Sequence, residues 1–357
     1  MSPTRQQGSS LARRAHIVYT SSNGFQVLDA NRIQIVAFVI RTEKRGTVGG
    51  LDSTIWVLEG DGNRADIWPA RGFNCFRWTV QSRELLYADP QFLEGSSPTR
   101  TGIPILFPFP NRIHDGRFSW DGQEFYLPVN DPQKKNAIHG FACQRPWRVI
   151  SQGTYAASAW ITGEFDCPRD APECQSLWPA NYRLRVTYRL ASGCLRIETM
   201  VDNTDCIPLP FGVGFHPYFR ISGDNLPITV PAKNYWELEE SLPTGSRKTV
   251  EGIRDLNDWK PFAELTLDDI LTDLSATWGP PGLCFRGEIL REPPLEIFTS
   301  ETFREAVVFT PPHRQAFCIE PYTCTTDAIN LQQRGVDAGL IVLSPGQSWT
   351  GIVEIHG

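Results

Sequence analysis

The apolar and polar positions of this chain alternate in short runs, which is the pattern of β-strands that bury one face. Residues 181–190 read NYRLRVTYRL, with apolar side chains at every second position from Tyr182 to Leu190. The alternation resumes in CLRIE, residues 194–198, after the short stretch ASG. We therefore predict two antiparallel strands joined by a tight turn.

Other segments repeat this pattern of strand and turn. Residues 116–129, GRFSWDGQEFYLPV, carry Asp-Gly between aromatic runs, which is a strong hairpin signal. Residues 25–40 carry the turn-forming DANR between two apolar stretches. Helix-length periodicity is scarce, and we expect only short helices, at residues 89–95 and 267–274. The fold class predicted is all-β, a large antiparallel β-sandwich with few short helices.

The chain has no low-complexity linker and no fixed-period repeat, so we expect one domain. We place this β-sandwich catalytic domain at residues 16–357, after a flexible N-terminal tail at residues 1–15. The 28 prolines and 29 glycines are spread evenly and suit a fold with many turns.

Composition excludes several classes of protein. The net charge of −6 is scattered and shows no cluster of Lys and Arg, so we expect no nucleic-acid partner. No apolar run approaches the roughly 20 residues that span a bilayer, and the first fifteen residues lack the apolar core of a secretory signal. We therefore expect a cytoplasmic protein without a membrane partner. The nine cysteines are scattered and form no C-x-x-C pair, which indicates reduced thiols.

Two histidines stand in apolar company, each where a predicted strand meets a turn, and scaffolds often present functional groups at such positions. His139 lies in NAIHGF and His216 in PFGVGFHPYF. Pro217 restricts the backbone of His216 to an extended conformation. Gly212 and Gly214 leave space beside it for a ligand or another strand. For both histidines, a place in the core with one hydrogen bond is the competing interpretation. The other four are expected at the surface or lack a supporting context: His16, His114, His313 and His356.

Glu320 is the carboxylate of interest, because it lies in the apolar run AFCIEPY, residues 316–322. Burying an unpaired charge costs several kcal/mol. If Glu320 is buried, it either pairs with a cation or has a raised pKa that suits a general base. A strand-end position facing water stays open as the alternative.

Two histidines and a carboxylate can also bind a metal, but no H-x-H or H-E-x-x-H spacing occurs, and we expect no metal. Neither a Walker loop nor a strand-linked G-x-G-x-x-G occurs, so we expect no cofactor.

The segment GIPILFPFPNRI, residues 102–113, ends in Arg112. An arginine donates forked hydrogen bonds at any pH, which suits sugar hydroxyls, although a surface ion pair is as good an explanation. Four aromatic side chains are candidates either for the apolar face of a pyranose or for the core: Phe107, Phe109, Phe141 and Trp147.

Five stretches together resemble the aldose 1-epimerase (galactose mutarotase) family, over nearly the whole chain after about residue 20. They are GIPILFPFPNRI, NAIHGF, LPFGVGFHPYF, CIEPYT and LSPGQSW, in this order. The resemblance implies a galactose mutarotase-like supersandwich with a broad cleft and no cofactor or metal. It also implies an isomerase that interconverts the α and β anomers of free hexoses such as galactose or glucose. A monosaccharide is then the substrate, and we expect a monomer or weak dimer.

The resemblance also assigns roles to residues. It implies that Glu320 is the general base and His216 the general acid of ring opening. His139 and Arg112 would bind the sugar, together with an aspartate that we place at Asp268, with Asp269 as the alternative. We expect an ionised Glu320 to raise the pKa of His216 and keep its ring protonated.

Three other functions stay open. A hexose-6-phosphate 1-epimerase would need further cations, for which Arg117, Arg145 and Arg148 are candidates. A non-catalytic sugar-binding protein could use the same scaffold. A polysaccharide lyase or hydrolase would use a tyrosine, Tyr218 or Tyr322, or a second carboxylate beside Glu320.

Residues 161–177 depart from the commoner members of that family. They contain Cys167 and Cys174, and we expect a surface loop without a disulfide.

Overall fold

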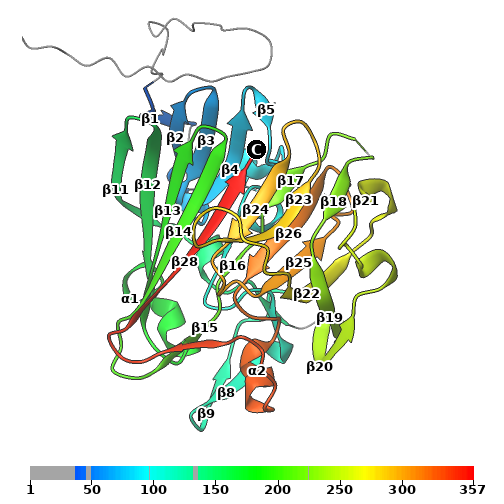
Figure 1. Cartoon of the computed structure of the whole chain (residues 1–357). Coiled ribbons are helices and arrows are strands. Elements are labelled where there is room, and N and C mark those ends of the chain that lie inside the picture. Colours follow the sequence, from blue (N-terminus) through cyan, green and yellow to red (C-terminus); the bar gives the residue numbers. More distant parts are fainter. Residues whose placement is uncertain (1–36, 46–49, 96, 132–135, 224) are drawn as a thin grey trace, which may run out of the picture. The chain divides into compact units, whose positions relative to one another are not determined.

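Antiparallel strands dominate the computed structural model, which describes residues 37–45, 50–95, 97–131, 136–223 and 225–357 (Figure 1). This confirms the all-β prediction. The expected boundary between residues 15 and 16 and the DANR turn at 29–32 lie outside the described residues. Among the residues described, no helix is long and apolar enough to cross a membrane.

The largest sheet has nine strands in the order β11-β12-β13-β14-β28-β24-β23-β18-β21. Its central hairpin, β13 with β14, is the one predicted from the alternating pattern, and Tyr182 to Leu190 bury every second side chain. Gly193 closes the turn with a φ of 62°. The strands are β11 (Arg148–Tyr155), β12 (Ser158–Asp166), β13 (Tyr182–Ala191), β14 (Cys194–Asn203), β28 (Ser348–His356), β24 (Leu295–Thr299), β23 (Cys284–Ile289), β18 (Pro227–Thr229) and β21 (Lys260–Pro261).

An eight-stranded sheet has the order β20-β19-β22-β25-β26-β16-β6, and β17 also pairs with β26. Phe317 and Ile319 of β26 join the main apolar core, which also contains Ile297 and Ile355 of the nine-stranded sheet. Because successive side chains of a strand point to opposite faces, Cys318, Glu320 and Tyr322 face away from that core. The strands are β20 (Leu242–Thr249), β19 (Ala232–Glu239), β22 (Asp268–Leu274), β25 (Glu305–Phe309), β26 (Ala316–Tyr322), β16 (Gly214–Phe215), β6 (Ile105–Leu106) and β17 (Tyr218–Arg220).

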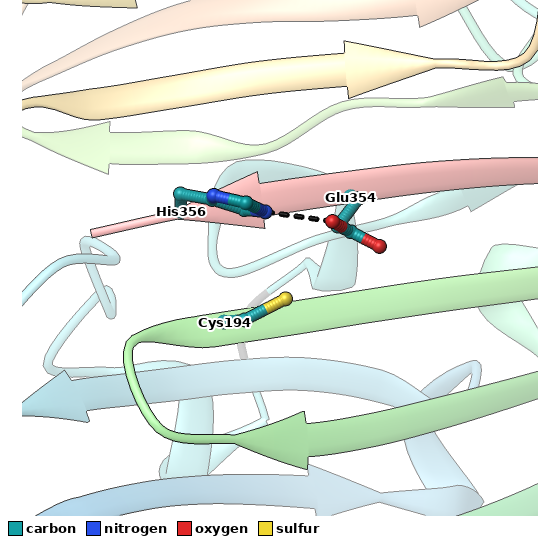
Figure 2. A group of neighbouring side chains, drawn as sticks. All are labelled: Cys194, Glu354 and His356. Atoms are coloured by element: carbon teal, nitrogen blue, oxygen red, sulfur yellow. Dashed lines mark hydrogen bonds and ion pairs between the residues drawn. The ribbon is translucent and has the colours of Figure 1, made fainter. Parts of the chain in front are cut away.

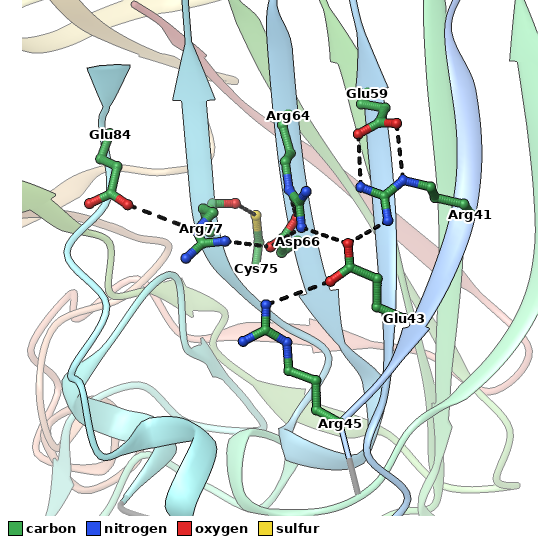
Figure 3. Close-up of polar contacts among 9 residues, drawn as sticks. All are labelled: Arg41, Glu43, Arg45, Glu59, Arg64, Asp66, Cys75, Arg77 and Glu84. Atoms are coloured by element: carbon green, nitrogen blue, oxygen red, sulfur yellow. Dashed lines mark hydrogen bonds and ion pairs between the residues drawn. The ribbon is translucent and has the colours of Figure 1, made fainter. Parts of the chain in front are cut away.

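A five-stranded sheet runs in chain order from β1 to β5, and β2 and β3 contact β12 and β13 of the nine-stranded sheet. A network of arginines and carboxylates crosses it (Figure 3). Arg64 donates to Asp66 at 2.6 and 2.9 Å, and Arg77 donates to the same buried carboxylate at 3.3 Å. These pairs satisfy a charge that would otherwise be costly to bury. The strands are β1 (Val39–Lys44), β2 (Thr54–Gly60), β3 (Asn63–Trp68), β4 (Asn74–Val80) and β5 (Arg83–Glu84).

Three two-stranded ribbons and short helices complete the described fold. The predicted Asp-Gly hairpin is β8 with β9, and Asp121 and Gly122 have φ angles of 49° and 77°. The ribbon strands are β7 (Arg112–Ile113), β8 (Arg117–Trp120), β9 (Gln123–Tyr126), β10 (Ala137–Ile138), β15 (Leu209–Phe211) and β27 (Ile341–Leu343). The α-helices are α1 (Cys167–Asp170) and α2 (Ala328–Gln333). The 3₁₀ turns are η2 (Pro69–Arg71), η3 (Phe92–Glu94), η4 (Pro98–Arg100), η5 (His114–Gly116), η6 (Ala142–Gln144), η7 (Pro172–Leu177), η8 (Gly252–Arg254) and η9 (Phe262–Glu264).

Two local predictions were wrong. Of residues 267–274, Asp268–Leu274 form strand β22 rather than a helix, because β19 and β25 pair with them on both sides and the run Asp269–Thr272 is buried. Residues 161–177 are not a surface loop. They complete β12 and then form α1 and η7, which bury Cys167 and Cys174 as free thiols. The helix expected at residues 89–95 is reduced to the 3₁₀ turn η3.

Candidate active site

A cavity of about 650 Å³ opens on the face of the eight-stranded sheet that carries Glu320 and Tyr322. Its volume lies within the range of small-molecule sites. All five residues singled out from the sequence line it: Arg112, His139, His216, Asp268 and Glu320. They come from β7, the turn after β10, the segment between β16 and β17, β22 and β26. The fold therefore gathers positions separated by more than 200 residues of sequence around one space.

Glu320 lies inside β26 with only 2% of its surface exposed, so the water-facing alternative is wrong. The hydroxyl of Tyr322 donates to Oε2 of Glu320 at 2.5 Å, and Oε1 lies 3.2 Å from Nε2 of His216. Burial raises the pKa of Glu320 well above its usual range, although the hydrogen bond from Tyr322 opposes that shift.

His216 is fixed by contacts on several sides. Its backbone N–H donates to the carbonyl of Pro104 at 3.1 Å, and its ring stacks on Tyr218 with a centroid distance of 4.5 Å. The hydroxyl of Tyr218 donates to the carbonyl of Thr99 at 2.8 Å and lies 3.4 Å from Nε2 of His216. Gly214 is required nearby, because an added Cβ would lie 2.6 Å from the ring of Tyr322. The space expected beside Gly214 is therefore filled by the side chain of Tyr322 from the neighbouring strand β26.

Burial works against the expected protonation of His216. Burial lowers the pKa of His216 to about 3, because the low-dielectric surroundings disfavour the imidazolium. Burial therefore favours the uncharged form of both groups, in which the proton of the pair is on Glu320. The 3.2 Å separation allows that proton to move directly between the two groups.

Arg112 and His139 lie on the paired ribbon strands β7 and β10 and the turn after them. Arg112 donates from Nε to Asp131 at 2.9 Å and from a terminal nitrogen to Asn111 at 3.0 Å, which orients the guanidinium. The turn depends on Gly140, with a φ of 65°, because an added Cβ would lie 2.1 Å from the carbonyl oxygen of Phe107.

The His139 ring lies 5.7 Å from the ring of His216, centroid to centroid. Burial lowers the pKa of His139 well below its usual range, so this imidazole is neutral. Its buried Nδ1 has no hydrogen-bond partner among the residues that the structure describes.

Asp268 and Asp269 begin β22 and point to opposite faces. Asp268 lines the cavity, whereas Asp269 is buried and accepts a hydrogen bond from Nε of Arg254 at 2.6 Å. Of the two, Asp268 is therefore the one placed to contact a ligand in the cavity.

Several cavity residues were not found from the sequence. His313 is exposed in a loop, as expected, but its ring also stacks on Tyr87 at 4.5 Å beside the cavity. Tyr218 and Tyr322 entered only the lyase alternative, although each lies two residues after a candidate and thus shares its strand face. The other lining residues missed are Asp89, Thr99, Arg100, Asn111, Ile138, Val307, Phe309, Pro311 and Pro312. The four aromatic candidates Phe107, Phe109, Phe141 and Trp147 are all core residues.

Cys318, two residues before Glu320 on the same strand face, adds a thiol to this site. The donor atoms of His216, Cys318 and Glu320 lie within 4.8 Å of one another, so this trio has the groups to hold a metal ion. Burial raises the pKa of the Cys318 thiol well above its usual range, which opposes formation of the thiolate that a metal requires.

The sandwich and its polar cavity place this protein in the galactose mutarotase-like class of folds. The chain belongs to the aldose 1-epimerase family, whose model matches residues 76–356 and thus includes every residue of the cavity.

The individual relatives have low sequence identity to this chain. The uncharacterized protein YihR of Escherichia coli is 24% identical over 265 residues, which cover 71% of this chain and 78% of YihR. The galactose mutarotase of Rattus norvegicus is 29% identical over 149 residues, 40% of this chain and 41% of that protein. The crystal structure of a galactose mutarotase-like protein from Clostridium acetobutylicum has a TM-score of 0.78 at 23% identity, covering 90% of this chain and 98% of that one.

Proposed function

We propose that this protein is an aldose 1-epimerase that interconverts the α and β anomers of free hexoses such as galactose or glucose. The observation that carries the proposal is the 3.2 Å separation between His216 Nε2 and Glu320 Oε1 beside a sugar-sized cavity. The ring oxygen and the anomeric hydroxyl of a hexose are both bonded to C1. An acid and a base that act on them must therefore lie close together.

The proposed reaction uses one proton held by the pair. With Glu320 ionised and His216 protonated, Glu320 takes the proton of the anomeric hydroxyl and His216 protonates the ring oxygen. The bond from C1 to the ring oxygen breaks and the aldehyde forms, which leaves the proton on Glu320 and His216 neutral. After rotation about C1–C2, the reverse transfers close the ring on the other face of C1. Opening and closing thus use alternate protonation states, and no external acid or base is consumed.

Ring opening needs the ionised form of Glu320, which burial disfavours. The hydrogen bond from Tyr322 and the positive charge of Arg112 both lower the pKa of this carboxyl. Sugar hydroxyls that donate to the carboxylate would act in the same direction. We therefore propose that sugar binding moves the proton from Glu320 to His216.

Arg112, His139 and Asp268 are the proposed sugar-binding residues. The guanidinium of Arg112 would donate hydrogen bonds to hydroxyl oxygens, and the carboxylate of Asp268 would accept hydrogen bonds from hydroxyl groups. The neutral ring of His139 would donate from one ring nitrogen and accept at the other. The unpartnered Nδ1 of His139 is consistent with a polar ligand at this position.

A hexose 6-phosphate is the alternative substrate. The three arginines considered for its phosphate do not line the cavity. Their carboxylate partners are Glu124 for Arg117, Glu173 for Arg145, and Asp170 with Glu164 for Arg148. Arg100 does line the cavity, which is why a phosphorylated sugar belongs in the test.

Polarimetry of freshly dissolved α-D-galactose, α-D-glucose and glucose 6-phosphate tests the proposal. We expect the purified protein to accelerate relaxation of the two free sugars to anomeric equilibrium. An unchanged rate for all three sugars would rule out this activity and leave the non-catalytic sugar-binding protein as the alternative. Acceleration confined to glucose 6-phosphate would establish the alternative substrate.

We also propose a cytoplasmic location. All nine cysteines are free, and seven of them are buried. Unpaired thiols suit the reducing compartment of the cell.

A further inference from the structure

A second group of ionisable side chains lies on the outer face of the nine-stranded sheet, where β14 begins and β28 ends (Figure 2). Cys194 pairs directly with His356 in the antiparallel register of β14 and β28, and Glu354 precedes His356 by two positions. Directly opposed residues share a face of the sheet, as do residues two apart on one strand. None of the three lines the catalytic cavity.

The side-chain donors of this trio already converge. The Sγ of Cys194, a carboxylate oxygen of Glu354 and a ring nitrogen of His356 lie within 4.8 Å of one another. Nε2 of His356 lies 2.7 Å from Oε1 of Glu354. A thiolate, an imidazole and a carboxylate are the three ligand types that zinc takes in proteins, at bond lengths of about 2.0–2.3 Å.

We infer that Cys194, Glu354 and His356 form a zinc-binding site on the outer face of the sheet, with water as the fourth ligand. Burial and the nearby Glu354 raise the pKa of the Cys194 thiol to about 12, so zinc has to displace its proton. Binding breaks the Cys194 S–H bond and releases that proton to solvent. The proton between Nε2 of His356 and Oε1 of Glu354 moves to Nδ1 of His356 or to solvent, and bonds form from zinc to Sγ, Oε1 and Nε2. The His356 side chain is 35% exposed, which gives the ion a route from solvent and leaves room for the water. Such a site would tie the start of β14 to the end of β28.

Neighbouring residues hold two of the ligands in place. Arg196 donates to Oε2 of Glu354 at 2.6 Å, which leaves Oε1 directed at His356. The ring of Phe298 lies 5.2 Å from the His356 ring, centroid to centroid. Outer contacts of this kind orient the ligands of a metal. Glu296 pairs with His356 from the other side, so the site has a second carboxylate on its border.

Calorimetric titration of the full-length protein with zinc chloride tests the site. In a second titration, cobalt chloride serves as a spectroscopic probe. We expect one zinc ion per chain and a thiolate-to-cobalt absorption band in the near ultraviolet. Cys194→Ser should abolish that band, and His356→Gln should weaken zinc binding at least about tenfold. The circular dichroism of both variants without metal should match that of the parent, since neither residue belongs to the apolar core.

Two cysteine variants act as matched controls. Cys206→Ser removes an exposed thiol elsewhere, and Cys318→Ser removes the buried thiol next to His216 and Glu320. Both should retain the cobalt band and the zinc affinity. Absence of zinc binding at micromolar concentration, or loss of the band in Cys318→Ser instead of Cys194→Ser, would overturn the inference. Neither result depends on whether the protein is an epimerase.

Discussion

The hydroxyl of Tyr322 donates to Oε2 of Glu320 over 2.5 Å, and this bond leaves the other carboxyl oxygen directed at the cavity. Both residues belong to β26 and share one face of the strand. The bond also lowers the pKa of Glu320 against the effect of burial. Tyr322 is therefore a positioning residue for the proposed base.

Replacing Tyr322 by Phe removes this bond and keeps the ring. We expect kcat to fall about tenfold with little change in KM, since the lost interaction serves the carboxylate and not sugar binding. The pKa of Glu320 rises further without the bond, so the acidic limb of the kcat/KM profile should move to higher pH. Polarimetric rates over a pH series measure both effects. Tyr126→Phe, an exposed tyrosine of β9, is the control. An unshifted profile in Tyr322→Phe would count against the positioning role.

Glu320→Gln and His216→Asn should each lower kcat at least about a hundredfold, because each removes one partner of the proton exchange. The double variant should be little worse than either single variant, since the two groups act as a unit. Mutarotation rates of the three variants, with near-ultraviolet circular dichroism to verify folding, provide the measurement. A folded single variant with nearly parental activity would exclude the proposed acid and base.

The sequence alone did not decide whether Asp268 or Asp269 binds the sugar, and the substitutions Asp268→Asn and Asp269→Asn test this. Asp268→Asn should raise KM for the sugar several-fold, as should Arg112→Ala, because both groups face the ligand space. Asp269→Asn should leave KM unchanged and lower the free energy of unfolding by about 2 kcal/mol, because it weakens the ion pair with Arg254. Initial rates give the KM of each variant, and urea unfolding gives its free energy of unfolding. A raised KM in Asp269→Asn alone would reverse the assignment.

The sequence could predict the parts of the site that depend on local pattern. Glu320 and His216 stood out because ionisable groups are costly in apolar strands, and both proved buried. Alternation with a period of two also predicted the β13–β14 and β8–β9 hairpins.

Other parts depend on pairings between distant segments, which no local pattern contains. Tyr87 reaches the cavity because its neighbour Leu86 bridges to Phe219, and His313 stacks on it from a third segment. The run at residues 267–274 suits either a helix or a strand, and only its neighbours β19 and β25 make it a strand.

Glu305, at the start of β25, makes stability depend on pH. It is 1% exposed, Nε1 of Trp236 donates to its Oε2 at 3.1 Å, and burial raises its pKa to about 8. In the unfolded chain this carboxyl titrates near 4.5. Between these two values the folded state binds more protons than the unfolded state, so the free energy of unfolding falls as pH rises. The loss is about 1.4 kcal/mol for each unit of pKa shift and is complete above pH 8.

Glu305→Gln keeps the shape of the side chain and removes this titration. We expect the variant to lose less stability than the parent between pH 5 and pH 8 and to be the more stable protein above pH 8. Urea unfolding at a series of pH values measures the difference. The control Glu239→Gln changes an exposed glutamate and should leave the slope unaltered. Since Glu320 and Asp327 also have raised pKa values, part of the slope should persist in Glu305→Gln and decrease further when Glu320→Gln is added. Equal slopes in the parent and Glu305→Gln would show that Glu305 is already ionised in the folded protein.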